Sequence, residues 1–285
     1  MHHYTAPTMC IGPKTFAWGE HTYIMGVINV SPESFSGDGV ADADAAVARA
    51  RQIAAGGADM LDVGGQSTRP GTRGTDEGFD EITPEEEIRR VVPVIERLRD
   101  ELPDVPVSID TYKPAVAKQA LAAGAHMLND IWGFRRDPSL ARIAADAGIP
   151  AIVMHNQRGR RADDVMAAII DGLRESLRIA SEARIAEGRI IVDPGFGFGW
   201  SPEHNIEMLR RLRELEALRA PVMIGTSRKS TIGAMLGGAP VGERLIGTAA
   251  SVALAIAGGA DIVRVHDVAA MRQAAVVADA VVRGY

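Results

Sequence analysis

The sequence contains a single cysteine, Cys10, among 285 residues. One cysteine excludes an internal disulfide bond and a zinc site built from cysteine ligands, and it is typical of a reducing compartment. No basic segment followed by an apolar stretch opens the chain, and no run reaches the roughly 18 to 20 apolar residues that span a bilayer. We therefore expect a cytoplasmic protein that does not associate with a membrane.

Lysine and aromatic residues are also scarce, with only four lysines and 5% aromatic residues. The formal net charge is −6, whereas proteins that bind a nucleic-acid backbone present clustered cations. We therefore expect no nucleic-acid partner, and any anionic ligand has to be held by a local cluster of basic residues. The 46% of apolar residues are enough to bury a large core.

From residue 20 onward, short apolar runs alternate with longer stretches of helical period, which predicts βα units and a parallel sheet. A chain of 285 residues leaves roughly 36 residues for each of eight units, which favours a single (β/α)8 TIM barrel in the α/β class. An open doubly wound sheet is the alternative, but no dinucleotide-binding fingerprint is present. We expect residues 1–19 to form an N-terminal extension and residues 20–285 to form the barrel domain. The predicted strands are residues 23–29, 60–64, 107–110, 127–130, 151–155, 190–193, 222–225 and 262–266.

Three related segments precede predicted strands: AAGGADML, AAGAHML and AGGADIV. Glycine closes a helix readily because it adopts the left-handed backbone conformation without steric cost. These segments therefore predict helix ends.

Active sites of such barrels lie at the carboxyl ends of the strands. The predicted strand ends are polar throughout, which indicates a polar pocket at that rim. The polar residues and segments at these ends are Asn29, GGQSTRPG after Asp62, Asp110, Asn129, Asp130, His155, Asp193, SRKS after Gly225, Arg264, His266 and Asp267.

The rim contains two kinds of group. Asp110, Asn129 and Asp193 are mostly acceptors and suit a planar heterocycle with an amino-amidine edge, since a carboxylate accepts two parallel N–H donors there. The alternative for Asp110 is a helix cap. The second group is cationic or polar and suits a diphosphate or carboxylate, although a lysine at this place is also compatible with a Schiff base. Its members are Thr68, Arg69, Lys229, Arg264 and His266.

Taken together, the motifs resemble those of the dihydropteroate synthases, the folate-pathway enzymes that sulfonamides target. The resemblance runs from about Tyr23 to the last helix. In chain order the motifs are MGVINVSPESFS, DVGGQSTRPG, SIDTYKPAVA, LNDIWG, VMHN, DPGFGFG, SRKS and IVRVHDV.

The resemblance implies a TIM-barrel transferase that joins 6-hydroxymethyl-7,8-dihydropterin diphosphate to 4-aminobenzoate, giving 7,8-dihydropteroate and diphosphate. It implies catalytic roles for Lys229, Arg264, His266 and Asp38, and Mg²⁺ as cofactor with Asn29 as ligand. The implied pterin site contains Asp110, Asn129, Ile131, Met154, Asp193, Phe198, Gly225, Lys229 and Arg264. The implied diphosphate site contains Asn29, Thr68, Arg69, Arg264 and His266, and the implied 4-aminobenzoate site contains Phe35, Pro70, Phe198 and Ser227.

The resemblance also implies a homodimer, formed through late helices such as the one containing GTAASVALAIAGG, although the same pattern suits the buried side of a barrel helix. Three positions depart from the family pattern. The family usually reads PDSFSDGG where this chain has PESFSGDG, which moves the second acid to Asp38. Gln66 replaces a glutamate beside Arg69, and Trp200 stands where relatives often carry lysine.

Three alternatives stay open from the residues alone. One is a pterin-binding methyltransferase that acts with a corrinoid partner, against which STRPG and SRKS count. A second is a non-catalytic pterin-binding relative, for which the shifted Asp38 is the support. A third is an aldolase that forms a Schiff base through Lys229.

Overall fold

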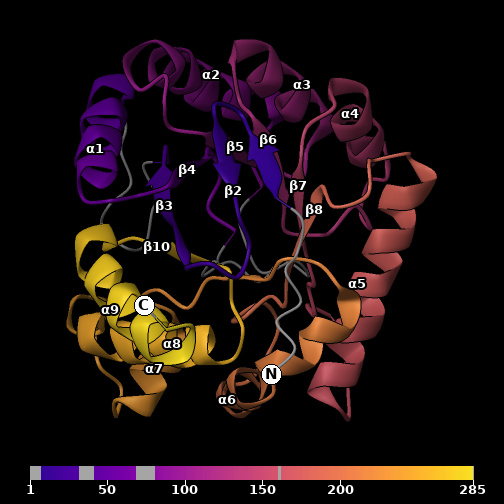
Figure 1. Ribbon diagram of the computed structural model, residues 1–285. Coiled ribbons are helices and arrows are strands. Elements are labelled where there is room, and N and C mark those ends of the chain that lie inside the picture. Colours follow the sequence, from indigo (N-terminus) through magenta and orange to yellow (C-terminus); the bar gives the residue numbers. More distant parts are fainter. Residues whose placement is uncertain (1–7, 32–41, 69–80, 160–161, 285) are drawn as a thin grey trace.

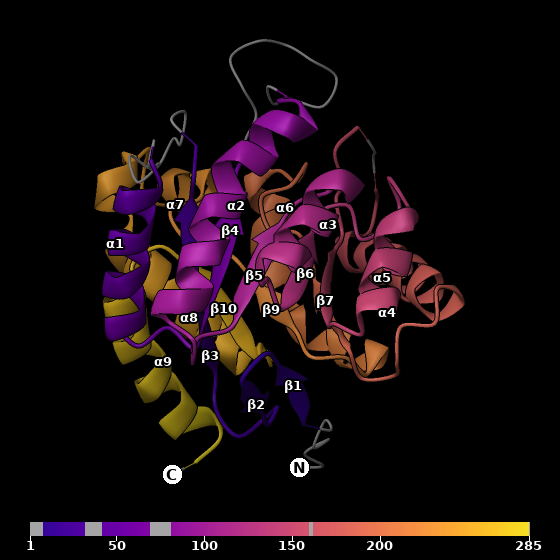
Figure 2. The same ribbon diagram turned by 90° about the horizontal axis from the view of Figure 1, so that it is seen from above.

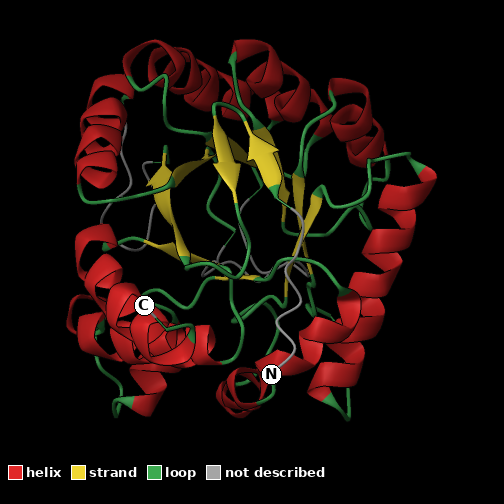
Figure 3. Ribbon diagram, in the orientation of Figure 1, coloured by secondary structure: helices red, strands yellow, loops and turns green. Residues whose placement is uncertain are grey.

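The computed structural model describes residues 8–31, 42–68, 81–159 and 162–284. Within these residues, eight parallel strands curl into a barrel that a ring of helices surrounds (Figures 1 and 3). The sheet order is β8-β7-β6-β5-β4-β3-β10-β9, and a parallel bridge between Val192 and Val222 joins its two edges. The predicted (β/α)8 barrel is therefore confirmed.

Five strands have the predicted bounds, and β7, β9 and β10 are one or two residues shorter than predicted. The barrel strands are β3 (Tyr23–Asn29), β4 (Met60–Gly64), β5 (Val107–Asp110), β6 (Met127–Asp130), β7 (Ala151–Met154), β8 (Ile190–Asp193), β9 (Met223–Ile224) and β10 (Ile262–Val265). The helices are α1 (Ala43–Ala55), α2 (Pro84–Glu101), α3 (Pro114–Ala123), α4 (Ser139–Ala147), α5 (Val165–Glu182), α6 (Pro202–Arg210), α7 (Ser230–Met235), α8 (Leu245–Ala257) and α9 (Val268–Val282), with 3-10 turns η1 (Leu212–Leu218) and η2 (Val241–Glu243).

Local sequence accounts for several helix boundaries. Asp42 accepts a hydrogen bond from the backbone of Ala45 at the start of α1, and Asp164 does the same for Ala167 at the start of α5. Gly124 ends α3 with a φ of 117°, as the glycine segments predicted. Among the described residues, no helix has both the length and the apolar character needed to cross a bilayer.

The barrel strands are buried on both faces because alternate side chains point to opposite sides. In β4, Leu61 and Val63 pack against the helices in the outer core, whereas Met60 belongs to an inner core inside the barrel. The same alternation directs Asp62 and Gly64 to the barrel interior. The barrel interior is thus apolar toward the amino-terminal ends of the strands and polar at their carboxyl ends.

An antiparallel hairpin of β1 (Met9–Ile11) and β2 (Lys14–Phe16) precedes the barrel and was not predicted. Its apolar side chains, together with Trp18, pack against the inner core at the amino-terminal ends of the strands. Figure 2 shows the hairpin at that end of the barrel. The hairpin therefore closes the barrel floor, while the division into an extension and a barrel domain stays a prediction.

Candidate active site

Four of the predicted site residues lie toward the carboxyl ends of barrel strands and face the interior. Asp110 ends β5, Asn129 lies in β6 and Asp193 ends β8. Arg264 of β10 donates through Nη2 to Asp110 Oδ2 at 2.8 Å. The fold therefore gathers predicted acceptors from three strands around a guanidinium from a fourth.

Asp62 of β4 organises this group, although the sequence reasoning did not assign it a role. Its Oδ2 atom accepts from Arg264 Nε at 2.6 Å and from Asn129 Nδ2 at 3.0 Å, and the residue is fully buried. Because Asp62 occupies the amide nitrogen of Asn129, the amide oxygen is the atom that can receive a donor from a ligand. The sequence signal for such a role is the presence of a charged residue inside the otherwise apolar strand MLDVG.

Burial alters the acidity of the carboxylates at the site. It raises the pKa of Asp110 to about 7, against the lowering effect of the nearby Arg264 charge. Burial likewise raises the pKa of Asp193, and the positive charge of Lys229 opposes that shift. The site thus holds a carboxyl group that titrates near neutral pH.

The segment DPGFGFG folds back toward the barrel after β8. Asp193 Oδ1 accepts from the backbone of Gly195 at 2.7 Å. Gly195 has a φ of 77°, and a Cβ atom there would lie 1.8 Å from the carbonyl oxygen of His155, so only glycine fits. Lys229 donates through Nζ to the carbonyl of Phe196 and lies 4.6 Å from the ring centroid of Phe198. The glycine-rich segment therefore holds Lys229 close to Asp193.

One side of the site is apolar. Ile131 and Met154 form a buried cluster with Tyr112, and Phe198 packs against its edge. At Gly225, a Cβ atom would meet Arg264 only at an ordinary 3.7 Å, so packing of the protein does not require glycine there. The glycine leaves space beside the Cβ atom and the backbone oxygen of Arg264.

Ser227 and His266 form a buried pair at the ends of neighbouring strands. His266 Nδ1 lies 2.9 Å from Ser227 Oγ, and the backbone N–H of His266 donates to the same oxygen at 3.2 Å. The adjacent Arg228 pairs with Asp267 at 2.6 Å. The SRKS segment is thus joined to the end of β10.

The remaining predicted residues are placed as follows. Asn29 ends β3 in register with Gly64, and the carbonyl of Thr68 accepts a hydrogen bond from Arg158. Arg158 also lies 4.8 Å from the ring centroid of Phe198, a rim position that sequence reasoning missed. Phe35, Asp38, Arg69 and Pro70 lie outside the described residues.

Two residues expected at the polar rim are turned away from it. Asp130 accepts from the backbone of Trp132 and Phe134 and so shapes its own loop. The ring of His155 packs against α5 and lines a separate cavity of about 670 Å³ beside that helix. Both residues follow interior-facing positions, so strand alternation directs them outward. Trp200 is also buried and stacks on His155 at 5.9 Å.

In the part of the chain that the structure describes, no three carboxylate, histidine or cysteine side chains gather to hold a metal ion. A magnesium ion at this site would need oxygens from its substrate and from water, as magnesium sites commonly do. Asn29 fits such a site as a single amide ligand. The expected cofactor therefore stays a proposal.

Comparisons with known proteins agree with this geometry. Residues 25–266 match the family described as pterin binding enzyme. The dihydropteroate synthase of Clostridium beijerinckii is 45% identical over 277 residues, which cover 96% of this chain and all of that protein. A Clostridium difficile dihydropteroate synthase crystallised with pteroic acid is 45% identical with a TM-score of 0.87, covering 94% of this chain and 99% of that chain.

The dihydropteroate synthase of Xanthomonas albilineans, solved with 4-aminobenzoic acid, is 39% identical with a TM-score of 0.87. That similarity covers 97% of this chain and 98% of the other. The similarity covers nearly the full length of both chains, and the motifs stand in the family's order. The match is therefore not limited to a shared barrel fold. The chain belongs to the pterin-binding enzymes and, within them, to the dihydropteroate synthases.

Proposed function

We propose that the interior group of Asp110, Asn129 and Asp193 binds the pterin ring of 6-hydroxymethyl-7,8-dihydropterin diphosphate. The ring carries N–H donors along one edge, and the site offers two carboxylates and one amide oxygen. The 3.0 Å bond from Asn129 to Asp62 supports this assignment because it orients the amide as an acceptor. The acceptor orientation of the Asn129 amide between two carboxylates is the main structural support for a pterin site here.

The apolar side of the site suits the faces of the same ring. Ile131, Met154 and Phe198 contribute side chains to it, and Gly225 leaves room beside Arg264. Lys229, held near Asp193, balances the negative charge of the acceptors and contacts the ring. A planar heterocycle therefore finds both edge and face contacts.

Catalysis requires departure of diphosphate from the pterin methylene group. Negative charge grows on the leaving oxygens, and preorganised cations stabilise it. We assign Arg264, His266 and Lys229 to this stabilisation, and Thr68 and Arg69 to binding of the diphosphate, with Asp38 completing the catalytic set. A Mg²⁺ ion held by Asn29 would add charge neutralisation at the diphosphate when bound.

The 4-aminobenzoate site is assigned to Phe35, Pro70, Phe198 and Ser227. The aniline nitrogen attacks the methylene carbon, the carbon–oxygen bond to diphosphate breaks, and the nitrogen loses a proton to water or to the departing diphosphate. An aniline is already nucleophilic, so the step needs no strong base. A sulfonamide resembles aminobenzoate in shape, and we expect it to compete for this site.

We also propose that the protein is a homodimer joined through late helices, including α8 and α9, which pack against each other (Figure 1). These helices expose large apolar side chains, including Ile246 at 78% and Val281 at 83%. Extended apolar patches on proteins commonly mark interfaces. Cytoplasmic location stays a proposal, supported by the single cysteine.

The direct test of the proposed site is diphosphate release by the Asp193→Asn and Lys229→Ala variants, supplied with both substrates and Mg²⁺. Each variant should lose most of its turnover while keeping its melting temperature. Turnover equal to that of the unaltered chain would refute the assigned site. Borohydride trapping would detect the alternative Schiff base at Lys229.

A further inference from the structure

Tyr112 lies two residues beyond Asp110 and has no role in the proposed site. Its ring is buried, with 6% exposure, and packs with Ile131 and Met154. Those two side chains belong to the proposed pterin pocket. The ring of Tyr112 is therefore part of the same apolar wall.

The hydroxyl of Tyr112 has a partner for donation and another for acceptance. It donates to Glu81 Oε1 at 2.8 Å and accepts from Gln66 Nε2 at 2.9 Å. Burial and the hydrogen bond to Glu81 raise the pKa of Tyr112, so the hydroxyl stays protonated near neutral pH. Arg136 lies 4.5 Å from the ring centroid and pairs with Glu81 at 3.0 Å. The ring is thus fixed through both its hydroxyl and its face.

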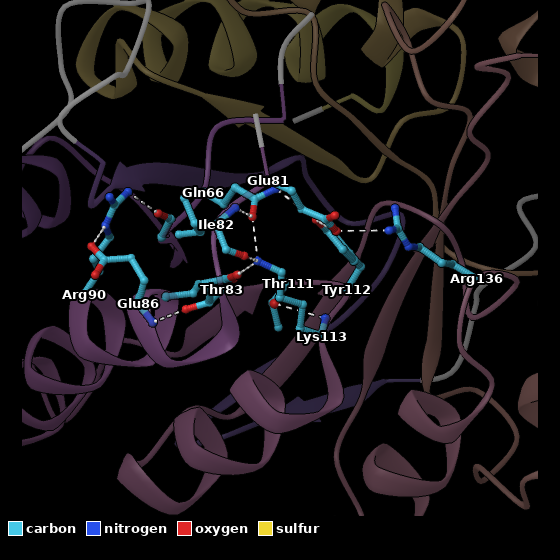
Figure 4. Close-up of polar contacts among 12 residues, drawn as sticks. Gln66, Glu81, Ile82, Thr83, Glu86, Arg90, Thr111, Tyr112, Lys113 and Arg136 are labelled. Atoms are coloured by element: carbon cyan, nitrogen blue, oxygen red, sulfur yellow. Dashed lines mark hydrogen bonds and ion pairs between the residues drawn. The ribbon is translucent and has the colours of Figure 1, made fainter. Parts of the chain in front are cut away.

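Lys113 determines which way the Gln66 amide points. Its ammonium group has only donors, so the oxygen of Gln66 must face it, and Lys113 Nζ does lie 2.6 Å from Gln66 Oε1. The amide nitrogen is then directed to Tyr112. Figure 4 shows this chain of contacts from Lys113 through Gln66 to Tyr112.

Lys113 is itself held rigidly. Besides Gln66 it donates to the carbonyl of Ile82 at 2.6 Å and to Glu87 Oε2 at 2.8 Å, which satisfies the three N–H donors of the ammonium group. Lys113 and Glu87 are both buried, so their charges are paired away from water. A rotation of Gln66 would break contacts with this buried pair.

We propose that Tyr112 is a further wall residue of the pterin pocket and that Gln66 is the residue that positions it. The ring sets the width available to the planar heterocycle, and the amide is the side chain that both accepts from Lys113 and donates to Tyr112. A carboxylate at position 66 would accept from Lys113 but has no hydrogen to donate. This inference rests on the proposed pterin site.

The test measures binding of 6-hydroxymethyl-7,8-dihydropterin diphosphate by calorimetry, together with KM and kcat for both substrates. Tyr112→Ala should weaken pterin binding about tenfold, because the wall is lost, and raise the KM for that substrate with kcat nearly unchanged. Tyr112→Phe should recover most of the affinity. Gln66→Glu should weaken binding roughly threefold, since the ring is retained but loses one anchor.

Tyr23→Phe is the matched control, since Tyr23 is equally buried at 6% and its hydroxyl accepts from the backbone of Ala17 at 2.8 Å on the barrel floor. It should leave pterin affinity unchanged. Folding of each variant is checked by its melting temperature; if Tyr112→Ala does not fold, Tyr112→Leu replaces it.

Asp193→Asn, measured in parallel, distinguishes failure of the proposed pterin site from failure of the proposed role of Tyr112. Normal pterin affinity in Asp193→Asn would overturn the proposed site itself. Weakened affinity in Asp193→Asn with normal affinity in the Tyr112 and Gln66 variants would overturn only the role of Tyr112. A lowered melting temperature without a change in affinity would show that Tyr112 is merely structural.

Discussion

Asp62 and Arg264 are 202 residues apart in the chain, yet Asp62 Oδ2 and Arg264 Nε lie 2.6 Å apart inside the barrel. The same carboxylate oxygen holds Asn129. One buried aspartate therefore orients a cation and an amide that both belong to the proposed pterin site.

Asp62→Asn should lower kcat/KM by about tenfold or more, because the amide keeps the volume but loses the charge that orients Arg264 and Asn129. Steady-state kinetics measure this effect. Asp59→Asn is the matched control, since Asp59 pairs with Arg272 just before β4, at its amino-terminal end. A larger kinetic loss in the control than in Asp62→Asn would contradict the assignment.

Asp193→Asn should weaken binding of the pterin substrate more than capture of aminobenzoate. A hydrogen bond to a charged group contributes about 1.5 to 3 kcal/mol, which corresponds to roughly a 10- to 100-fold change in Kd. Calorimetry with the pterin diphosphate measures it. An unchanged Kd would show that Asp193 makes no contact with the ring.

Pterin binding should weaken as the pH falls below about 7, the pKa of Asp110, because the protonated carboxyl no longer accepts two N–H donors. The free energy of unfolding of the ligand-free protein should instead increase as the pH falls. The folded-state pKa is raised above the unfolded value of about 3.9, so the contribution of Asp110 to stability is full below that value and is lost as the pH rises through 7.

Calorimetry and thermal unfolding at several pH values check both slopes. In Asp110→Asn the contributions of Asp110 to the pH dependence of binding and of stability should both disappear. Pterin binding in this variant should be weaker and less dependent on pH. Identical pH profiles in the variant and the unaltered chain would assign the titration to another group.

The barrel floor should be sensitive to loss of the hairpin packing. Phe16→Ala removes a side chain that is 1% exposed, and such a change typically costs 3 to 5 kcal/mol, so we expect about that loss in the free energy of unfolding. Denaturant unfolding measures it. Thr15→Ala, at the exposed neighbouring position, should change it by less than about 0.5 kcal/mol.

Ile246→Glu should convert the proposed dimer into monomers, because it replaces an apolar side chain that is 78% exposed on α8 with a charge. Analytical ultracentrifugation gives the mass directly. The exposed Glu187, far from α8 in sequence, provides a control as Glu187→Gln and should leave the mass unchanged. A monomeric unaltered chain would refute the homodimer.

The barrel could be predicted because its signals are local. Apolar runs such as residues 60–64 recur in each unit, and the glycine segments mark three of the helix ends. The β1–β2 hairpin gave no comparable signal, since each strand has three residues and is held by the inner core rather than by its own pattern.

At the site, Asp110, Asn129 and Asp193 were predictable because they lie at or near the ends of strands. Asp62 and Gln66 were not assigned, because their roles come from partners far along the chain. Lys113, for example, is 47 residues from Gln66. The prediction that Asp130 and His155 lie at the rim was wrong, because the alternation of side chains along a strand directs them outward.

The hairpin on the barrel floor also bears on how ligands move. Because β1, β2 and the inner core close the amino-terminal end, we expect a ring held near Asp62 and Arg264 to enter and leave through the carboxyl end of the barrel. With the pterin ring in the proposed interior site, we expect the pterin diphosphate to bind before aminobenzoate and the joined product to leave through the same opening. We therefore expect the residues of the barrel floor, which belong to neither proposed substrate site, to influence the order in which the substrates bind.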